Sequence, residues 1–149
     1  MGKSEKDKML AGELYRPGDL EIQADQAATK PWLVRYNAAL GLPADERRAL
    51  LAERFAAVGE GAVVRPPFHC DFGFNTRLGA NVFLNFNCVI LDVVAVRIGD
   101  GTQIGPACRS MPPIIQEMPR RAREGWSSAN RFTLAVIAGL VAARLSSPA

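Results

Sequence analysis

The chain has 149 residues, 48% of them hydrophobic and 22% charged, with a formal net charge of +3. This composition describes a soluble globular protein of one domain, or a small domain with an appendage. The positive charge is confined to the end of the chain. Residues 108–149 carry six Arg, no Lys and two Glu, whereas residues 1–107 carry 12 Lys and Arg against 13 Asp and Glu. This distribution of charge therefore excludes a basic surface that would bind nucleic acid.

The cysteines, the N-terminus and the apolar runs exclude further classes. Cys70, Cys88 and Cys108 are odd in number and lack CxxC spacing, so neither a disulfide framework nor a metal site is indicated. The opening residues, MGKSEKDKML, are charged where a signal peptide needs an apolar region. The apolar run Phe132–Ala143 spans 12 residues, whereas a membrane-spanning helix needs about 20. We expect a cytoplasmic protein with no membrane or nucleic-acid partner.

The first sixty residues show helical patterns. Ser4 followed by Asp7 predicts a capping box at the start of a first helix. A second helix is expected over residues 19–39, kinked or interrupted at Pro31, which lacks a backbone donor. A third is expected to start at Pro43 and to end before Gly59. Its apolar stripe is formed by Leu50, Leu51, Arg54, Phe55 and Val58.

From Val63 onward an apolar residue recurs every six positions. Phe72, Leu78, Leu84 and Ile90 follow this spacing, the register then slips by two, and Ile98 and Ile104 resume it. A period of six is typical of a parallel β-helix of hexapeptide repeats, in which one apolar side chain per short strand points inward. Three such repeats make one triangular coil. The predicted fold is therefore mainly β with a helical cap, and about two coils are expected over residues 63–107.

The same segments resemble the maltose/galactoside O-acetyltransferases, a branch of the hexapeptide-repeat acyltransferases. The resemblance is carried by EKDKMLAGELYRPGD near the start, by RYNAAL, and by FHCDFGFNTRLGANVFLNFNCVILDVVAVRIGDGTQIGP. It covers residues 5–107. The resemblance implies a helical cap over residues 1–60, a left-handed β-helix over residues 61–107, a homotrimer, and acetyl transfer from acetyl-CoA to a sugar hydroxyl. It implies no tightly bound cofactor, since acetyl-CoA is a co-substrate.

In that family a histidine acts as general base, in a segment similar to TADHP that follows IGP. An imidazole suits this role because its pKa lies near working pH. The chain has no such segment, and its single histidine, His69, stands before the CDFG motif. The resemblance therefore assigns no catalytic residue here, and His69 is interpreted as a structural or surface residue.

The sequence after Ala107 changes character and is expected to be out of frame. When the codons of ACRSMPPIIQ are read with one added base, they can encode AVQIYAADHP, which contains the missing histidine. The stretch EGWSSANRFTLAVIAGLVAARLSSPA is likewise compatible with RLEFGKPVHIGRHRWIGGGAIVLPG. We therefore expect a single-base deletion or a sequencing error near codon 107. Residues 108–149 would then be a tail that is disordered or weakly helical, and the β-helix would be incomplete.

Four residues are candidates for binding the acceptor sugar. By resemblance, Asn85 in LNFN and Asp92 in ILD line the acceptor pocket, where an amide and a carboxylate can bind two hydroxyls. The alternative is turn chemistry, because Asn and Asp at corners often bond to their own backbone. Tyr15 and Arg16, in GELYRPGD, are expected to reach the sugar from the cap. Cys70 and Cys88 are interpreted as small buried residues rather than nucleophiles.

Two hypotheses of function follow. The first is an acetyl-CoA-dependent sugar O-acetyltransferase, with a maltose-, glucose- or galactoside-type acceptor. The second is a catalytically inactive remnant that binds sugar weakly or associates with intact subunits. A membrane-associated role through residues 132–143 is a distant third. The first two differ in whether the histidine segment and the later coils are present.

Overall fold

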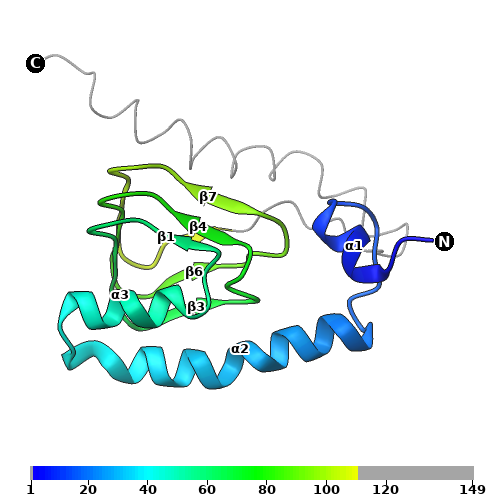
Figure 1. Cartoon of the computed structure of the whole chain (residues 1–149), viewed down its shortest axis with the longest axis horizontal. Coiled ribbons are helices and arrows are strands. Elements are labelled where there is room, and N and C mark those ends of the chain that lie inside the picture. The colour runs from blue at the N-terminus through cyan, green and yellow to red at the C-terminus, as the bar shows by residue number, and fades with distance from the viewer. Residues whose placement is uncertain (1, 111–149) are drawn as a thin grey trace, which may run out of the picture.

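The computed structural model describes residues 2–110, and within them short helices precede a stack of short strands (Figure 1). The helices are α1 (Glu5–Leu10), α2 (Leu20–Ala38), the 3₁₀ helix η1 (Ala39–Gly41) and α3 (Ala44–Ala52). The strands are β1 (Ala57–Val58), β2 (Val63–Val64), β3 (Phe68–Cys70), β4 (Thr76–Leu78), β5 (Phe83–Leu84), β6 (Cys88–Ile90), β7 (Val96–Ile98), β8 (Gln103–Ile104) and β9 (Arg109–Ser110).

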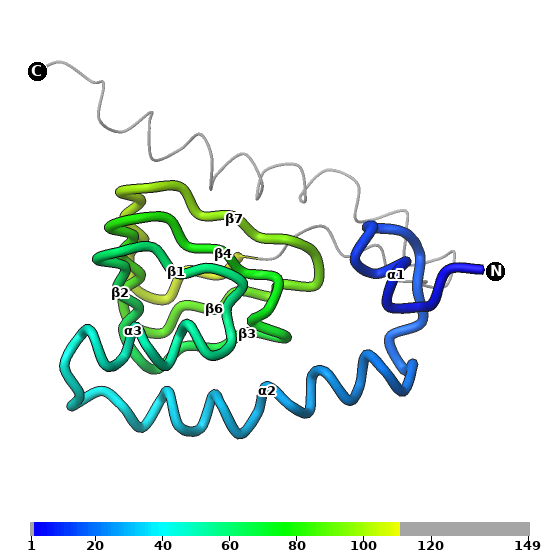
Figure 2. Tube along the Cα trace, in the orientation of Figure 1, coloured from blue at the N-terminus to red at the C-terminus, as the bar shows by residue number. Residues whose placement is uncertain are grey.

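The strands form a parallel β-helix. They pair in three parallel sheets, with orders β1-β4-β7, β2-β5-β8 and β3-β6-β9. The register sets Val58 beside Leu78 and Leu78 beside Ile98, so each residue lies over the one twenty positions earlier. Three successive strands therefore make one coil, and three coils stack in the tube trace of Figure 2.

The coils repeat a spacing of six, six and eight residues between inward positions. Val64 and Cys70 continue the first coil, just as Leu84 and Ile90 continue the second. The eight-residue step between Ile90 and Ile98 is the register slip seen in the sequence, and it also separates Cys70 from Leu78. Residues 63–107 hold the strands β2 to β8, which make about two coils as the sequence predicts, and the third coil is completed by β1 before this range and β9 after it.

Phe72 has a different place from the one its spacing predicts. It follows β3 in the eight-residue step, and it packs in a separate cluster with Met9, Ile22 and Val93 rather than inside the coils. Phe72 stands six residues before Leu78 only because the longer step has eight residues, and the inward position at its start is Cys70, two residues before Phe72. Leu78, by contrast, belongs to the main core.

One corner of the β-helix repeats a left-handed backbone conformation. Gly61, Asn81 and Gly101, twenty residues apart, have φ values of 69°, 54° and 69°. Glycine and asparagine are the residues that adopt this region most readily. The corner between the first and second sheets is thereby a tight turn in every coil.

The predicted capping box is confirmed at the start of α1, where the Ser4 and Asp7 side chains each accept a bond from the other's backbone N–H. Pro31 does not interrupt α2, which continues to Ala38. The second half of α2 is held by its packing on the β-helix. Trp32 Nε1 donates to the Leu50 carbonyl at 2.7 Å, and the Tyr36 hydroxyl donates to the Val64 carbonyl at 2.6 Å.

The third helix is shorter than the sequence predicts. It begins after Pro43, as expected, but ends at Ala52, and Phe55 and Val58 lie beyond it. Apolar residues at these positions fit a helix and the first coil equally well, because both bury them against the same core. Phe55 packs at 5.7 Å from both Trp32 and Phe68, measured between ring centroids.

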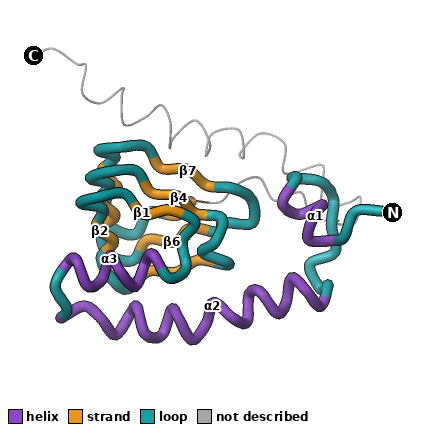
Figure 3. The backbone as a smooth tube through the Cα atoms, viewed as in Figure 1, coloured by secondary structure: helices purple, strands orange, loops and turns teal. Residues whose placement is uncertain are grey.

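A single core joins the helices to the coils. It contains Trp32 and Tyr36 of α2, Leu51 of α3 and the inward residues of the β-helix. Figure 3 shows α2 and α3 lying together below the strands, with α1 above the N-terminal end of α2. The helices therefore cover the first coil, which would otherwise expose apolar side chains.

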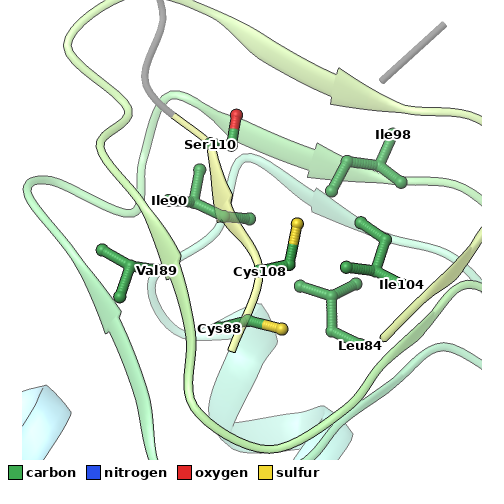
Figure 4. Close-up of a pocket in the computed structure, with 8 residues that line it drawn as sticks. All are labelled: Leu84, Cys88, Val89, Ile90, Ile98, Ile104, Cys108 and Ser110. Carbon is green, nitrogen blue, oxygen red and sulfur yellow. The ribbon is translucent and has the colours of Figure 1, made fainter. Parts of the chain in front are cut away.

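The inward residues of the last described coils line a cavity of about 20 Å³ (Figure 4). Leu84, Ile98 and Ile104 contribute to its wall. Arg109 and Ser110 pair with β6, so the described β-helix extends three residues beyond the predicted boundary at Ala107. The rest of the predicted out-of-frame tail, residues 111–149, lies outside the described residues.

The core predicts a stability difference between a buried and an exposed substitution. Leu84 is fully buried and should lose about 2–5 kcal/mol of unfolding free energy on truncation in Leu84→Ala, from lost transfer energy and a cavity. Val34, which is 71% exposed on α2, is the control, and Val34→Ala should change stability by less than about 0.5 kcal/mol. Urea unfolding followed by circular dichroism measures both. Equal losses would contradict the β-helix core.

Candidate functional site

Asp92 lies in the eight-residue step between β6 and β7, and its side chain is fully buried in the chain. Its Oδ1 accepts the Phe72 backbone N–H at 2.9 Å, and its Oδ2 accepts the Thr76 hydroxyl at 3.2 Å. Asn75 Nδ2 donates to the Asp92 carbonyl at 2.8 Å. Since Phe72 is the residue one coil below, Asp92 fastens two successive coils at the same corner.

Burial raises the pKa of Asp92 above its ordinary value, although the bonds from Phe72 and Thr76 act in the opposite direction. Burial also raises the pKa of Asp71. No ion pair with Asp92 is formed within residues 2–110. Within this range hydrogen bonds favour the carboxylate form, but they do not outweigh the cost of burying it.

A polar network connects this corner to the cap. The Phe72 carbonyl accepts Arg54 Nε at 2.6 Å and the Thr29 hydroxyl at 3.2 Å. Arg54 also donates through Nη2 to the Asp25 carbonyl of α2 at 3.0 Å. The loop around Phe72 is thus fixed between Asp92 on one side and α2 on the other.

Tyr15 and Arg16 are adjacent in sequence but differ in exposure. Tyr15 is buried, with Phe72 and Val93 in its cluster, so it packs next to the Asp92 corner. The Arg16 side chain is exposed, and its backbone N–H donates to Glu5 Oε2 at 2.7 Å. Arg16 also lines an open depression with Gly18, Asp19 and Leu20. The cap therefore brings Tyr15, but not the Arg16 side chain, into the packed region.

Asn85 lies at a different corner, between β5 and β6. Its Oδ1 accepts the Phe86 backbone N–H at 2.9 Å, which is the turn chemistry that the sequence left open. Arg65 Nη1 lies 3.5 Å from the same oxygen. Within one chain the structure brings Tyr15 near Asp92, but it leaves Asn85 at a separate corner of the prism.

His69 and the cysteines lie away from these corners. His69 is exposed at the centre of β3, paired in register with Val89. Cys70 and Cys88 are buried inward residues, and burial raises the pKa of both thiols. A thiol with a raised pKa is a poor nucleophile at neutral pH. The interpretation of these cysteines as core residues is consistent with their positions.

Arg65 and Arg54 also contribute to these corners, although the sequence patterns assign neither of them a role in the site. Arg65 stands twenty residues before Asn85, so the coil repeat places the two in the same position of adjacent coils. This relation could have been read from the sequence once the repeat of twenty was recognised. Arg54 follows α3 and makes its bonds across the fold, a role that no local pattern predicts.

Residues 2–110 lack the features of a membrane-spanning or a metal-binding site. No helix there is long and apolar enough to cross a lipid bilayer. No group of three or more His, Cys, Asp or Glu side chains there is arranged to hold a metal ion.

The fold and these corners define the class of protein as a hexapeptide-repeat β-helix with a helical cap. Residues 8–59 match the maltose acetyltransferase hexapeptide capping motif. The chain is 63% identical over 107 residues to nodulation protein L of Rhizobium leguminosarum bv. viciae, covering 72% of this chain and 56% of that protein. It is 58% identical over 125 residues to nodulation protein L of Rhizobium meliloti, covering 84% and 68%.

A more distant relative is the galactoside O-acetyltransferase of Escherichia coli, 32% identical over 100 residues, covering 67% of this chain and 49% of that protein. Among solved structures, a hexapeptide-repeat acetyltransferase of Vibrio cholerae in complex with acetyl-CoA has a TM-score of 0.66 at 34% identity, covering 84% of this chain and 67% of that one. A maltose O-acetyltransferase of Clostridium difficile has a TM-score of 0.71 at 28% identity, covering 84% and 66%.

The chain belongs to the hexapeptide-repeat acetyltransferase family. The predicted fold class, N-terminal helices followed by a left-handed parallel β-helix, is confirmed. The chain spans 56% of the length of one nodulation protein L and 68% of the other. The match over 84% of the chain extends past Ala107, into the stretch that the reading-frame hypothesis treats as out of frame.

The raised pKa of Asp92 predicts how stability depends on pH. A folded-state pKa above the unfolded value means that folding favours the protonated acid, so stability is lost as pH rises from about 4 through the folded-state pKa. Asp92→Asn removes this titration while its amide can still accept from Phe72. The unfolding free energy of the variant relative to the unmodified chain should therefore increase as the pH rises above about 4.

Urea unfolding at a series of pH values measures this difference. Asp45→Asn, at an exposed carboxylate in the first turn of α3, is measured alongside as the control for the loss of one negative charge. If the difference in unfolding free energy between Asp92→Asn and the unmodified chain does not change with pH, the Asp92 carboxyl titrates as it does in the unfolded chain.

Proposed function

We propose that the chain is the acceptor-binding part of an acetyl-CoA-dependent sugar O-acetyltransferase. The observation that carries this proposal is the similarity in fold and sequence to an acetyltransferase crystallised with acetyl-CoA. The sugar class is supported by the galactoside and maltose O-acetyltransferases among the similar proteins. A maltose-, glucose- or galactoside-type hydroxyl is therefore the proposed acceptor.

The reaction joins the acetyl carbonyl carbon to the oxygen of a sugar hydroxyl and breaks the thioester C–S bond. A base takes the hydroxyl proton, and the departing coenzyme A thiolate is protonated. The proposed contributions of this chain are binding and orientation. Asn85 offers an amide to the sugar, Arg16 lines an open depression on the cap, and Asp92 and Tyr15 fix the neighbouring corner.

A homotrimer would reconcile these positions with one acceptor site. Asn85 and Asp92 lie at different corners of the triangular prism, so a small sugar cannot bridge them within one chain through the packed core. When three prisms associate about a three-fold axis, one corner of each faces a different corner of its neighbour. A shared site between subunits is thus the arrangement we propose.

The general base is the part of the proposal that this chain does not supply. Its single histidine, His69, is exposed at mid-strand, on neither of the two corners. Loss of a general base costs typically about 10²- to 10⁴-fold in rate. This observation favours a second candidate function, a non-catalytic chain that binds sugar weakly or associates with intact subunits.

Acetyl transfer by two purified chains tests the proposal. One is the 149-residue chain. The other is the product of the same gene with one base added near codon 107, which should restore the histidine segment. With acetyl-CoA and maltose, glucose or a galactoside, the first should release coenzyme A at least about 10²-fold more slowly than the second. Thiol release and mass spectrometry of the sugar provide the two measurements.

Asn85→Ala in the restored chain is the matched variant and should raise the KM for sugar about two- to tenfold, the effect of one hydrogen bond. An unchanged KM would remove Asn85 from the acceptor site. Transfer by the 149-residue chain at the rate of the restored one would overturn the inactive-chain hypothesis. Sequencing the DNA across codons 105–112 decides separately whether the shift in frame is real.

A further inference from the structure

Arg65 and Asn85 occupy the same position in two adjacent coils. The Arg65 backbone N–H donates to the Leu84 carbonyl at 2.9 Å, and the Asn85 N–H donates to the Ile104 carbonyl at 3.0 Å. Both residues therefore leave their strands at the same corner, directly one above the other. Arg65 is exposed, and none of the ion pairs within residues 2–110 involves it.

Two aromatic rings of the second coil hold the Arg65 guanidinium in place. Its central carbon lies 5.3 Å from the centroid of the Phe83 ring and 4.9 Å from that of the Phe86 ring. Guanidinium groups within about 6 Å of a ring face are attracted to it. A long exposed side chain would otherwise sample many rotamers, and these two contacts direct Arg65 upward to the level of Asn85.

The neighbours of Asn85 determine which way its amide points. The Phe86 backbone N–H lies 2.9 Å from Oδ1, and Arg65 Nη1 lies 3.5 Å from the same atom. A backbone N–H and a guanidinium can only donate, so they accept no bond from the amide nitrogen. The amide oxygen must face these two donors. No hydrogen bond from Nδ2 to a residue within 2–110 is formed, so its two N–H donors have no partner in this range.

We propose that Arg65 is a positioning residue that turns the Asn85 amide so that its nitrogen, not its oxygen, is presented to the acceptor. This inference rests on the proposed function and makes it more specific. Asn85 then donates to a lone pair of a sugar hydroxyl oxygen. Arg65 itself does not touch the substrate. The competing explanation is that Arg65 only covers the Phe83 and Phe86 rings, in which case its loss leaves the amide unchanged.

Side-chain amide resonances of the 149-residue chain, labelled with ¹⁵N-asparagine, test the orientation directly. Asn85→Asp identifies the Asn85 pair by its disappearance. In Arg65→Met, which keeps length but removes the donors, we expect the two Asn85 proton shifts to move toward those of a free amide. Arg65→Lys should restore the shifts only in part, because an ammonium lacks the planar fork.

Arg77→Met is the control for loss of an exposed arginine, since Arg77 lies on another face, in β4. Arg77→Met should leave the two Asn85 side-chain amide proton shifts unchanged. Urea unfolding of all the variants shows whether Arg65→Met acts by destabilising the fold. An unmoved Asn85 pair in a folded Arg65→Met chain would overturn the inference, whatever the chain proves to bind.

Titration with maltose, glucose and a galactoside tests the functional half. Where the parent chain binds one of them, Arg65→Met should weaken binding about two- to tenfold, the effect of one misdirected hydrogen bond. If the Asn85 amide resonances shift but the affinity for sugar is unchanged, the orientation of the amide does not contribute to sugar binding, and that part of the inference is overturned. No binding of any sugar by the parent chain would count against the proposed function, while the resonances still decide whether Arg65 orients Asn85.

Discussion

The twenty-residue coil, closed by parallel backbone pairing, is the constraint on which the rest of the structure depends. Because each strand bonds to the strand one coil away, every residue lies over the residue twenty positions earlier. The chain cannot move a single side chain along the prism without breaking this register. Two contacts between coils on which the proposed acceptor site rests, Arg65 with Asn85 and Phe72 with Asp92, are direct consequences of that spacing.

A solenoid needs a cover at each end, and here the helices supply one of them. Solenoid repeats bury their apolar faces by stacking, so a terminal coil depends on a capping element. The cap covers apolar surface and also satisfies backbone hydrogen-bonding groups of the first coil. The Asn37 side chain of α2 accepts the Phe68 N–H at 2.8 Å and donates to the Phe68 carbonyl at 3.0 Å. Tyr36 adds its bond to Val64. The cap is thus part of the same folding unit as the first coil.

The sequence predicts the fold well wherever one residue type repeats, and less well where a step differs in length. Spacing alone predicts that Leu78, Leu84 and Ile90 point into the coils, and all three lie in the core. Phe72 shares the spacing but lies in the longer step, where its ring packs with the cap instead. The LNFN motif singles out Asn85, whereas the orientation of its amide depends on the Phe86 N–H and on Arg65, the latter through a contact between coils that no local pattern reveals.

The two acceptor candidates differ in what their surroundings allow them to do. Both oxygens of Asp92 accept bonds from the chain itself, so contact with a sugar would have to displace Phe72 or Thr76, or share an oxygen with them. Asn85 has only its oxygen engaged and keeps two donors. These contacts support the proposal that Asn85 is the residue that touches the acceptor. Asp92 is better suited to holding the loop of the longer step against the cap, where loss of its carboxylate would act on the sugar only through the position of that loop.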